Sequence, residues 1–151
     1  MMLVAHPDTF IESIRIQEFG DYMLTGKGTD ATQADVSTYL TVTPLAPLGS
    51  TLEGFDSYEF ELPADSSGQF NLVADVVFET PVMMVMVSLN NNLSTTSETG
   101  TTSFIQKKAV DGQPAIGIIV NPVPLPGAAW LLFSGMIGLA SLRKAANRRK
   151  M

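Results

Sequence analysis

The sequence predicts a small, mainly β protein: an antiparallel β-sandwich or jelly-roll-like domain, followed by one C-terminal transmembrane α-helix. Apolar residues alternate with a period of two, turn-forming residues separate these runs, and no stretch before Ala128 has a helical period. A chain of 151 residues can form one domain with a modest core. We expect a β-rich domain over residues 1–120 and a separate tail over residues 121–151.

The first half of the chain contains three alternating runs, over residues 13–17, 36–43 and 57–62. Gly20-Asp21 follows the first run and predicts a turn. Two prolines within residues 44–50 interrupt the pattern after the second run, because proline cannot donate to a β-ladder. The residues expected to face the core are Ile14, Ile16, Val36, Thr38, Leu40, Val42, Tyr58, Phe60 and Leu62.

The second half begins with a polar loop over residues 63–68 and continues with an alternating run over residues 69–79. Residues 82–89 are apolar on both faces, which predicts a central strand covered on two sides. Asn90–Asn92 predicts the next turn, and residues 103–106 and 115–120 are the last strand candidates. The expected core residues are Phe70, Leu72, Ala74, Val76 and Phe78, with Met83, Met84 and Met86 as core filler.

Charge is distributed unevenly along the chain. It contains 9 Lys and Arg against 15 Asp and Glu, and no acidic residue follows Asp111. Without the five basic residues of the tail, the remainder has a net charge of about −11. Phosphate binding requires a basic surface, so we expect no nucleic-acid partner. The absence of cysteine excludes disulfides, thiolate metal sites and cysteine nucleophiles.

Two short features resemble catalytic or nucleotide-binding motifs. Gly26–Asp30 contains a Gly-Lys pair, but a phosphate-binding loop requires Gly at position 21 and Ser or Thr at position 28, where Asp21 and Gly28 stand. A flexible β-turn is the simpler interpretation. His6 is the only histidine, so Ser-His-Asp chemistry would depend on a residue in a terminal segment. We expect a solvated end residue there.

Acidic and aromatic residues offer two further candidate sites. Oxygen ligands for Ca²⁺ could come from Asp56, Glu59, Glu61 and Asp65. Their spacing lacks the regularity of an EF-hand loop, and a solvated strand face explains them more simply. A sugar-stacking platform could come from Tyr22, Tyr39, Tyr58 and Trp130. Strand positions explain the tyrosines, and Trp130 suits a membrane boundary. We expect no metal, no cofactor and no catalytic residues, and therefore no enzyme.

The tail contains an uncharged stretch of 16 residues from Gly127 to Leu142. As an α-helix it would be about 24 Å long, slightly less than the bilayer's hydrocarbon thickness of about 30 Å. A buried core helix is the alternative, but the stretch has no polar face and a basic cluster follows it. Bilayer thinning and snorkelling accommodate the short length. We expect a membrane helix over 128–142, with Trp130, Leu131, Leu132, Phe133, Gly135 and Gly138.

The residues that flank this helix predict its orientation. The basic end over residues 143–151 predicts a cytoplasmic C-terminus, which places the β domain on the other side of the membrane. It contains Arg143, Lys144, Arg148, Arg149 and Lys150. Before the helix, Pro122, Pro124 and Pro126 favour an extended hinge over residues 121–127, the conformation that a protease or transpeptidase substrate needs.

The segment VPLPGAAWLLFSGMIGLASLRK closely resembles the VPLPA variant of the PEP-CTERM protein-sorting domain of Gram-negative bacteria. Signature, apolar span with small residues and basic end occur in the order that the family requires. Gly127 stands where the family usually has Ala, and residues 145–147 split the basic cluster. The signature residues are Val123, Pro124, Leu125, Pro126 and Gly127.

This resemblance implies export by the general secretory route, retention by the C-terminal helix and recognition by an exosortase. That membrane enzyme is expected to cleave near the signature and to pass the body to the cell surface or the exopolysaccharide matrix. The leading hypothesis is therefore a non-enzymatic, surface-directed structural or interaction protein. The alternatives are a permanently membrane-anchored protein, a carbohydrate-binding module and, as a third class, an enzyme.

The N-terminus does not match this expectation of export. Residues 1–10 have no basic region, only a short apolar run and no small-residue cleavage site, so they are not a secretory signal peptide. A sorting helix functions only after the body has crossed the membrane. We therefore expect Met1 to be an internal or misassigned start, with a signal peptide upstream in the natural product.

Overall fold

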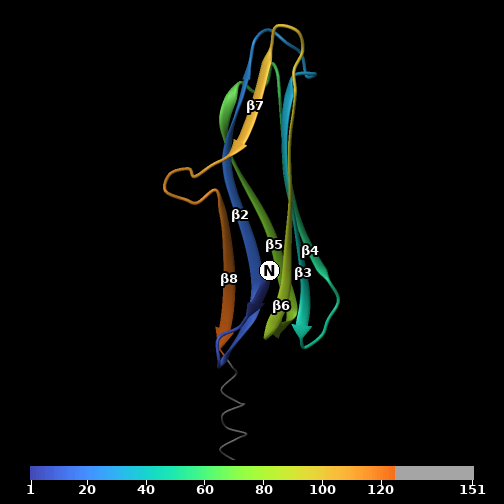
Figure 1. Cartoon of the computed structure of the whole chain (residues 1–151), viewed down its shortest axis with the longest axis vertical. Helices are drawn as coiled ribbons and strands as arrows, with labels where there is room; N and C mark the ends of the chain where they lie inside the picture. Colours follow the sequence, from blue (N-terminus) through green and yellow to red (C-terminus); the bar gives the residue numbers. More distant parts are fainter. Residues whose placement is uncertain (125–151) are drawn as a thin grey trace, which may run out of the picture.

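Two antiparallel β-sheets face each other in the computed structural model, which describes residues 1–124 (Figure 1). The mainly β fold expected from the alternation is confirmed. In chain order, the strands are β1 (Met2–Val4), β2 (Thr9–Thr25), β3 (Gln33–Ala46), β4 (Leu52–Glu61), β5 (Ser67–Val82), β6 (Met84–Thr96), β7 (Thr102–Lys107) and β8 (Ile116–Pro124).

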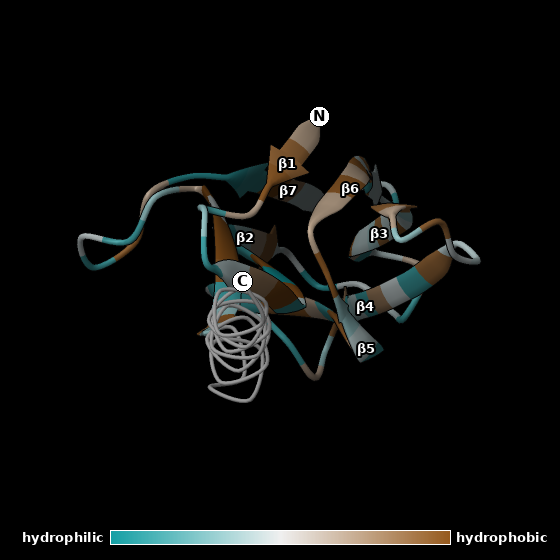
Figure 2. Ribbon diagram, turned by 90° about the horizontal axis from the view of Figure 1, so that it is seen from below, coloured by the Kyte–Doolittle hydropathy of each residue, from teal (hydrophilic) through white to brown (hydrophobic). Residues whose placement is uncertain are grey.

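Sheet A has the strand order β1-β6-β3-β4, and all its pairs are antiparallel. In sheet B, β5 pairs with one edge of β2, while β8 and β7 share the other edge end to end. β8 pairs with the first part of β2, over Thr9–Glu18, and β7 with the last part, over Gly20–Thr25. Viewed from below, β4 and β5 lie next to each other where the two sheets meet (Figure 2).

The core between the sheets follows the period of two. Alternating residues of β5, from Phe70 to Phe78, are all buried, as predicted. They pack with Ile14 and Ile16 of β2, among others, and with alternating residues of β3. Because successive side chains of a strand point to opposite faces, one face of each sheet supplies this core.

Two turns expected from the sequence are strand residues instead. Gly20-Asp21 lies within β2 and pairs with both β5 and β7. A Cβ at Gly20 would lie 2.1 Å from the Gln106 carbonyl oxygen and 2.3 Å from the Phe70 ring, so this glycine permits close approach rather than a turn. Asn90–Asn92 lies within β6, where the backbone pairs with β3 and the Asn91 side chain accepts a bond from Thr38.

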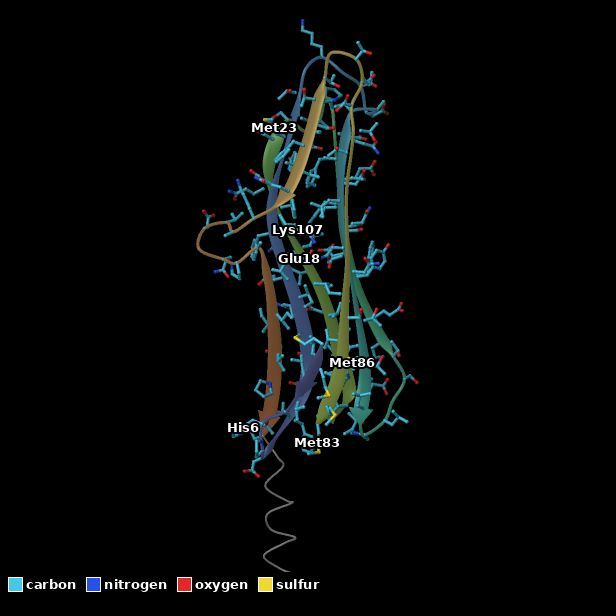
Figure 3. All side chains as sticks on the ribbon, in the orientation of Figure 1. His6, Glu18, Met23, Met83, Met86 and Lys107 are labelled. Atoms are coloured by element: carbon cyan, nitrogen blue, oxygen red, sulfur yellow. The ribbon has the colours of Figure 1, made fainter. Side chains whose placement is uncertain are left out.

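The prediction of a central, doubly covered strand over residues 82–89 is also wrong. Val85 and Val87 are buried, but Met83 and Met86 are exposed and Met84 is only partly buried. Figure 3 shows Met83 and Met86 at the lower end of the molecule. β6 lies within sheet A, and within residues 1–124 no other layer covers the sheet's outer face. The methionines on that side therefore do not fill the core.

Candidate functional site

The structure describes only the first two residues of the predicted sorting signature. Val123 and Pro124 end β8, where they pair with Phe10 and Thr9 at the start of β2. The remaining predicted tail residues lie outside the described part of the chain: Leu125, Pro126 and Gly127 of the signature, the helix over 128–142 and the basic end over 143–151.

β8 is a suitable strand for leading into that signature. It pairs with β2 along one edge, and Pro122 and Pro124 are tolerated there because proline is compatible with edge strands. Since Thr9 lies opposite Pro124, β8 ends at the end of the sandwich where β2 begins. The chain therefore reaches the signature at the end of an edge strand, outside the packed core.

Gly26–Asp30 connects β2 to β3 and is held by Glu98 from the turn between β6 and β7. The Thr29 backbone N–H donates to Glu98 Oε2 at 2.6 Å, and the Thr29 hydroxyl donates to Oε1 at 3.0 Å. The Thr32 hydroxyl donates to Oε2 at 3.1 Å. These bonds, led by the Thr29 backbone N–H, lower the pKa of Glu98. Gly26–Asp30 therefore lies in a connection between two strands, and a carboxylate accepts its hydrogen bonds.

The predicted His6 and acidic candidates are not brought together into a site. His6 is exposed, and its Nδ1 lies 2.9 Å from the Pro7 carbonyl oxygen. Asp56 Oδ2 accepts the Val73 backbone N–H at 2.8 Å, while Asp65 Oδ2 accepts that of Glu61 at 3.1 Å. Glu59 lies on the outer face of β4. Within residues 1–124, no three His, Asp or Glu side chains form a group that could hold a metal ion.

The three predicted tyrosines lie in different environments. Tyr22 is buried and stacks on Phe60 with 3.7 Å between ring centroids, and its pKa is raised first by burial and then by Asp65. Tyr58 was expected to face the core, but it is 45% exposed in the edge strand β4, with 6.0 Å between its ring centroid and that of Phe60. Tyr39 lies on the outer face of sheet A and contacts Phe55, with 4.5 Å between centroids and 38° between ring planes. Tyr39 thus forms an exposed pair with Phe55.

Sequence reasoning missed this pair because Phe55 lies just before the predicted strand over residues 57–62. β4 begins at Leu52, and its register with β3 places Phe55 directly opposite Tyr39. The alternation identified Tyr39 as an outward residue. Only the pairing of the two strands shows which side chain lies beside it.

A buried ion pair between the sheets was also missed. Lys107 Nζ donates to Glu18 Oε2 at 2.5 Å; the Glu18 side chain is fully buried and that of Lys107 is 12% exposed. Figure 3 shows both side chains between the sheets. Glu18 Oε1 has no hydrogen-bond partner within residues 1–124. Continuing the inward alternation from Ile14 and Ile16 would have identified Glu18 as an interior position.

A second polar contact lies on the inner face of sheet A. The Thr38 hydroxyl donates to Asn91 Oδ1 at 2.9 Å, and Thr38 is fully buried. Glu18 is one inward position after Ile16 and Thr38 is one before Leu40, and both of these apolar neighbours belong to the largest core cluster. Polar groups therefore interrupt the apolar core between its two ends.

Comparisons with known proteins add no identity: no protein-family model, curated protein or solved structure matches the chain. Among residues 1–124, there is also no helix long and apolar enough to cross a membrane.

Proposed function

We propose that the protein is an exported, surface-directed bacterial protein of the structural or interaction type, sorted by its C-terminal tail. A membrane helix over residues 128–142 retains it in the inner membrane with the β domain on the periplasmic side. An exosortase then cleaves near Val123–Gly127 and passes the body to the cell surface or the exopolysaccharide matrix. In this role the β domain binds other components and performs no catalysis.

The observation that carries the proposal is the order of elements after the last strand. The signature, an uncharged stretch and a basic cluster follow one another over residues 123–150. The positive residues favour a cytoplasmic C-terminus. The end of β8 supports this reading, because Val123 and Pro124 lie in an edge strand rather than in the core.

The proposal is tested in the protein's own host, with and without a functional exosortase. We expect a shortened protein in the surface or extracellular fraction of the parent strain. The exosortase-deficient strain should contain only the full-length protein, in the membrane fraction. Immunoblots of both fractions, with mass spectrometry of the new C-terminus, provide the measurement.

Two variants sharpen the test. Replacing Pro124 and Pro126 with Ala in the signature should reduce processing, whereas Pro47→Ala, in the hairpin between β3 and β4, should not. A single full-length, membrane-bound species in the strain with active exosortase would contradict sorting. That result would leave a permanently membrane-anchored protein.

A further inference from the structure

The outer face of sheet A carries one pair of exposed aromatic rings. Tyr39 of β3 and Phe55 of β4 are directly opposite in the register, and their ring centroids are 4.5 Å apart. Tyr39 is 49% and Phe55 53% exposed. Two large rings that contact each other and still keep about half of their surface in water form a small apolar patch in the middle of a sheet face.

Short polar side chains surround this patch. The register places Asn90 beside Tyr39, with further hydroxyl, amide and carboxylate groups in the adjoining rows. The side-chain hydrogen bonds within this face lie farther along the strands, at Thr43–Thr51, Asp35–Ser94 and Gln33–Asp35. The groups next to the rings are Asn90, Asn92, Ser57, Ser88, Thr41 and Glu53. The hydroxyl and amide groups can both donate and accept hydrogen bonds close to the rings, and the Glu53 carboxylate can accept them.

The charge of this face restricts the ligand. None of the strands of sheet A contains Lys or Arg. The outer face of sheet B differs, since Arg15 pairs there with Asp75 at 2.7 Å and Lys108 pairs with Asp21. Sites that stack nucleic-acid bases combine aromatic rings with basic residues, which bind the phosphates. The strands of sheet A offer no such cation beside Tyr39 and Phe55 for a phosphate-bearing or otherwise anionic ligand. The face therefore lacks the cations that an anionic ligand needs, whereas an uncharged ligand needs none.

A neutral sugar matches this combination of groups. One side of a pyranose ring presents C–H groups, which can stack on aromatic rings, and its rim presents hydroxyls for amide and hydroxyl partners. We propose that the Tyr39–Phe55 face binds a neutral oligosaccharide or polysaccharide chain. This inference deepens the proposed function by naming the class of partner. It rests on that function in one respect, namely that the protein meets the polysaccharide at the cell surface.

The test must separate binding from a purely structural role, because cross-strand aromatic pairs also stabilise sheets. We suggest saturation-transfer NMR on the full chain in a zwitterionic detergent that lacks a sugar headgroup. The probes are cellohexaose, xylohexaose and mannohexaose as neutral chains and hexaguluronate as an anionic one. The variants are Tyr39→Leu with Phe55→Leu, which keeps apolar side chains but removes both rings, and Phe104→Ala, which removes a similarly exposed ring from sheet B.

We expect at least one neutral hexasaccharide to receive saturation at its C–H protons and to show upfield shifts from ring currents. The double variant should weaken its affinity about tenfold or more, a change of about 1.4 kcal/mol, while Phe104→Ala leaves it unchanged. No transfer to any neutral probe, equal binding by the double variant, or binding of hexaguluronate alone would overturn the inference. A wild-type dimer that the double variant makes monomeric would assign the face to a second copy and also overturn it.

Loss of sorting and loss of sugar binding remain distinguishable. The NMR experiment uses purified protein and does not depend on an exosortase. A chain that is never processed but binds a neutral hexasaccharide would contradict the proposed sorting and support this inference. A processed chain that binds no neutral hexasaccharide would support the proposed sorting and contradict this inference.

Discussion

The two flanks of the sandwich differ, although the same two sheets form both. At the flank that we call the closed flank, β4 of sheet A meets β5 of sheet B (Figure 2). At the flank that we call the open flank, β6 of sheet A lies across from β7 and β8 of sheet B. At the closed flank, close contacts to the backbone of β5 join the two sheets. At the open flank, inward-facing apolar residues are in contact with solvent.

At the closed flank, residues of β4 lie in close contact with the backbone of β5. Asp56 of β4 accepts the backbone N–H of Val73 of β5 at 2.8 Å, so a side chain bridges the two strand edges. Gly54 lies so close to β5 that a Cβ would be 2.6 Å from the Asp75 carbonyl oxygen. Fully buried Leu72 and Ala74 lie on β5 behind these contacts.

Along the middle of the open flank, inward-facing residues of β8 are exposed to solvent. Ile116 and Ile118 of β8 lie opposite Glu18 and Ile16, which are fully buried, so both isoleucines point to the inner face. They are nevertheless 43% and 42% exposed. Across from β8 on sheet A, β1 extends the sheet beyond β6 only next to Met84–Met86. The difference teaches that burial depends on whether the opposite sheet reaches over a residue, as well as on the face it occupies.

The largest expected effect concerns the ion pair of Glu18 and Lys107, whose lysine comes from β7 at the open flank. Lys107→Met removes the partner of a fully buried carboxylate and should destabilise the full chain by about 3–5 kcal/mol in urea unfolding. Combining it with Glu18→Leu removes both charges, so most of that loss should be recovered. A double variant no more stable than Lys107→Met would show that the pair's packing matters more than its charge.

A matched pair of glycine substitutions compares the flanks directly. Gly54→Ala at the closed flank forces a Cβ against the Asp75 backbone and should cost about 1–3 kcal/mol. Gly117→Ala in β8 should change stability by less than about 0.5 kcal/mol, because its nearest neighbour would be 3.8 Å away. Urea unfolding of both variants provides the measurement. Equal effects would contradict a difference in tightness between the flanks.

The smallest expected effect is a pH dependence at one end of the open flank, where Glu98 holds the Gly26–Asp30 turn. The pKa of Glu98 is lowered in the folded protein, mainly by the Thr29 backbone N–H. Its contribution to stability is therefore present above the ordinary glutamate pKa of about 4.3 and is lost as pH falls below it. Glu98→Gln should be less stable than the parent at pH 7 and equal to it near pH 2. A difference that persists at pH 2 would show that the carboxylate's charge is not the cause.

The sequence by itself determined the strand periodicity and most of the core. The alternation of β5 from Phe70 to Phe78, and of β3 from Val36 to Val42, correctly identified the buried residues. Such patterns are local, because successive side chains of one strand point to opposite faces whatever the strand pairs with. The tail signature is equally local, and it supports a sorting proposal without reference to any fold.

Only the tertiary structure decided where strands continue and which outward or inward residues meet. Gly20 and Asn90–Asn92 have the composition of turns, yet Phe70 and β7 pack against the first, and β3 pairs with the second. Likewise, Phe55 became the neighbour of Tyr39, and Lys107 the partner of Glu18, through pairings between residues far apart in the chain. Contacts of this kind depend on strand order and register, which a period of two leaves undetermined.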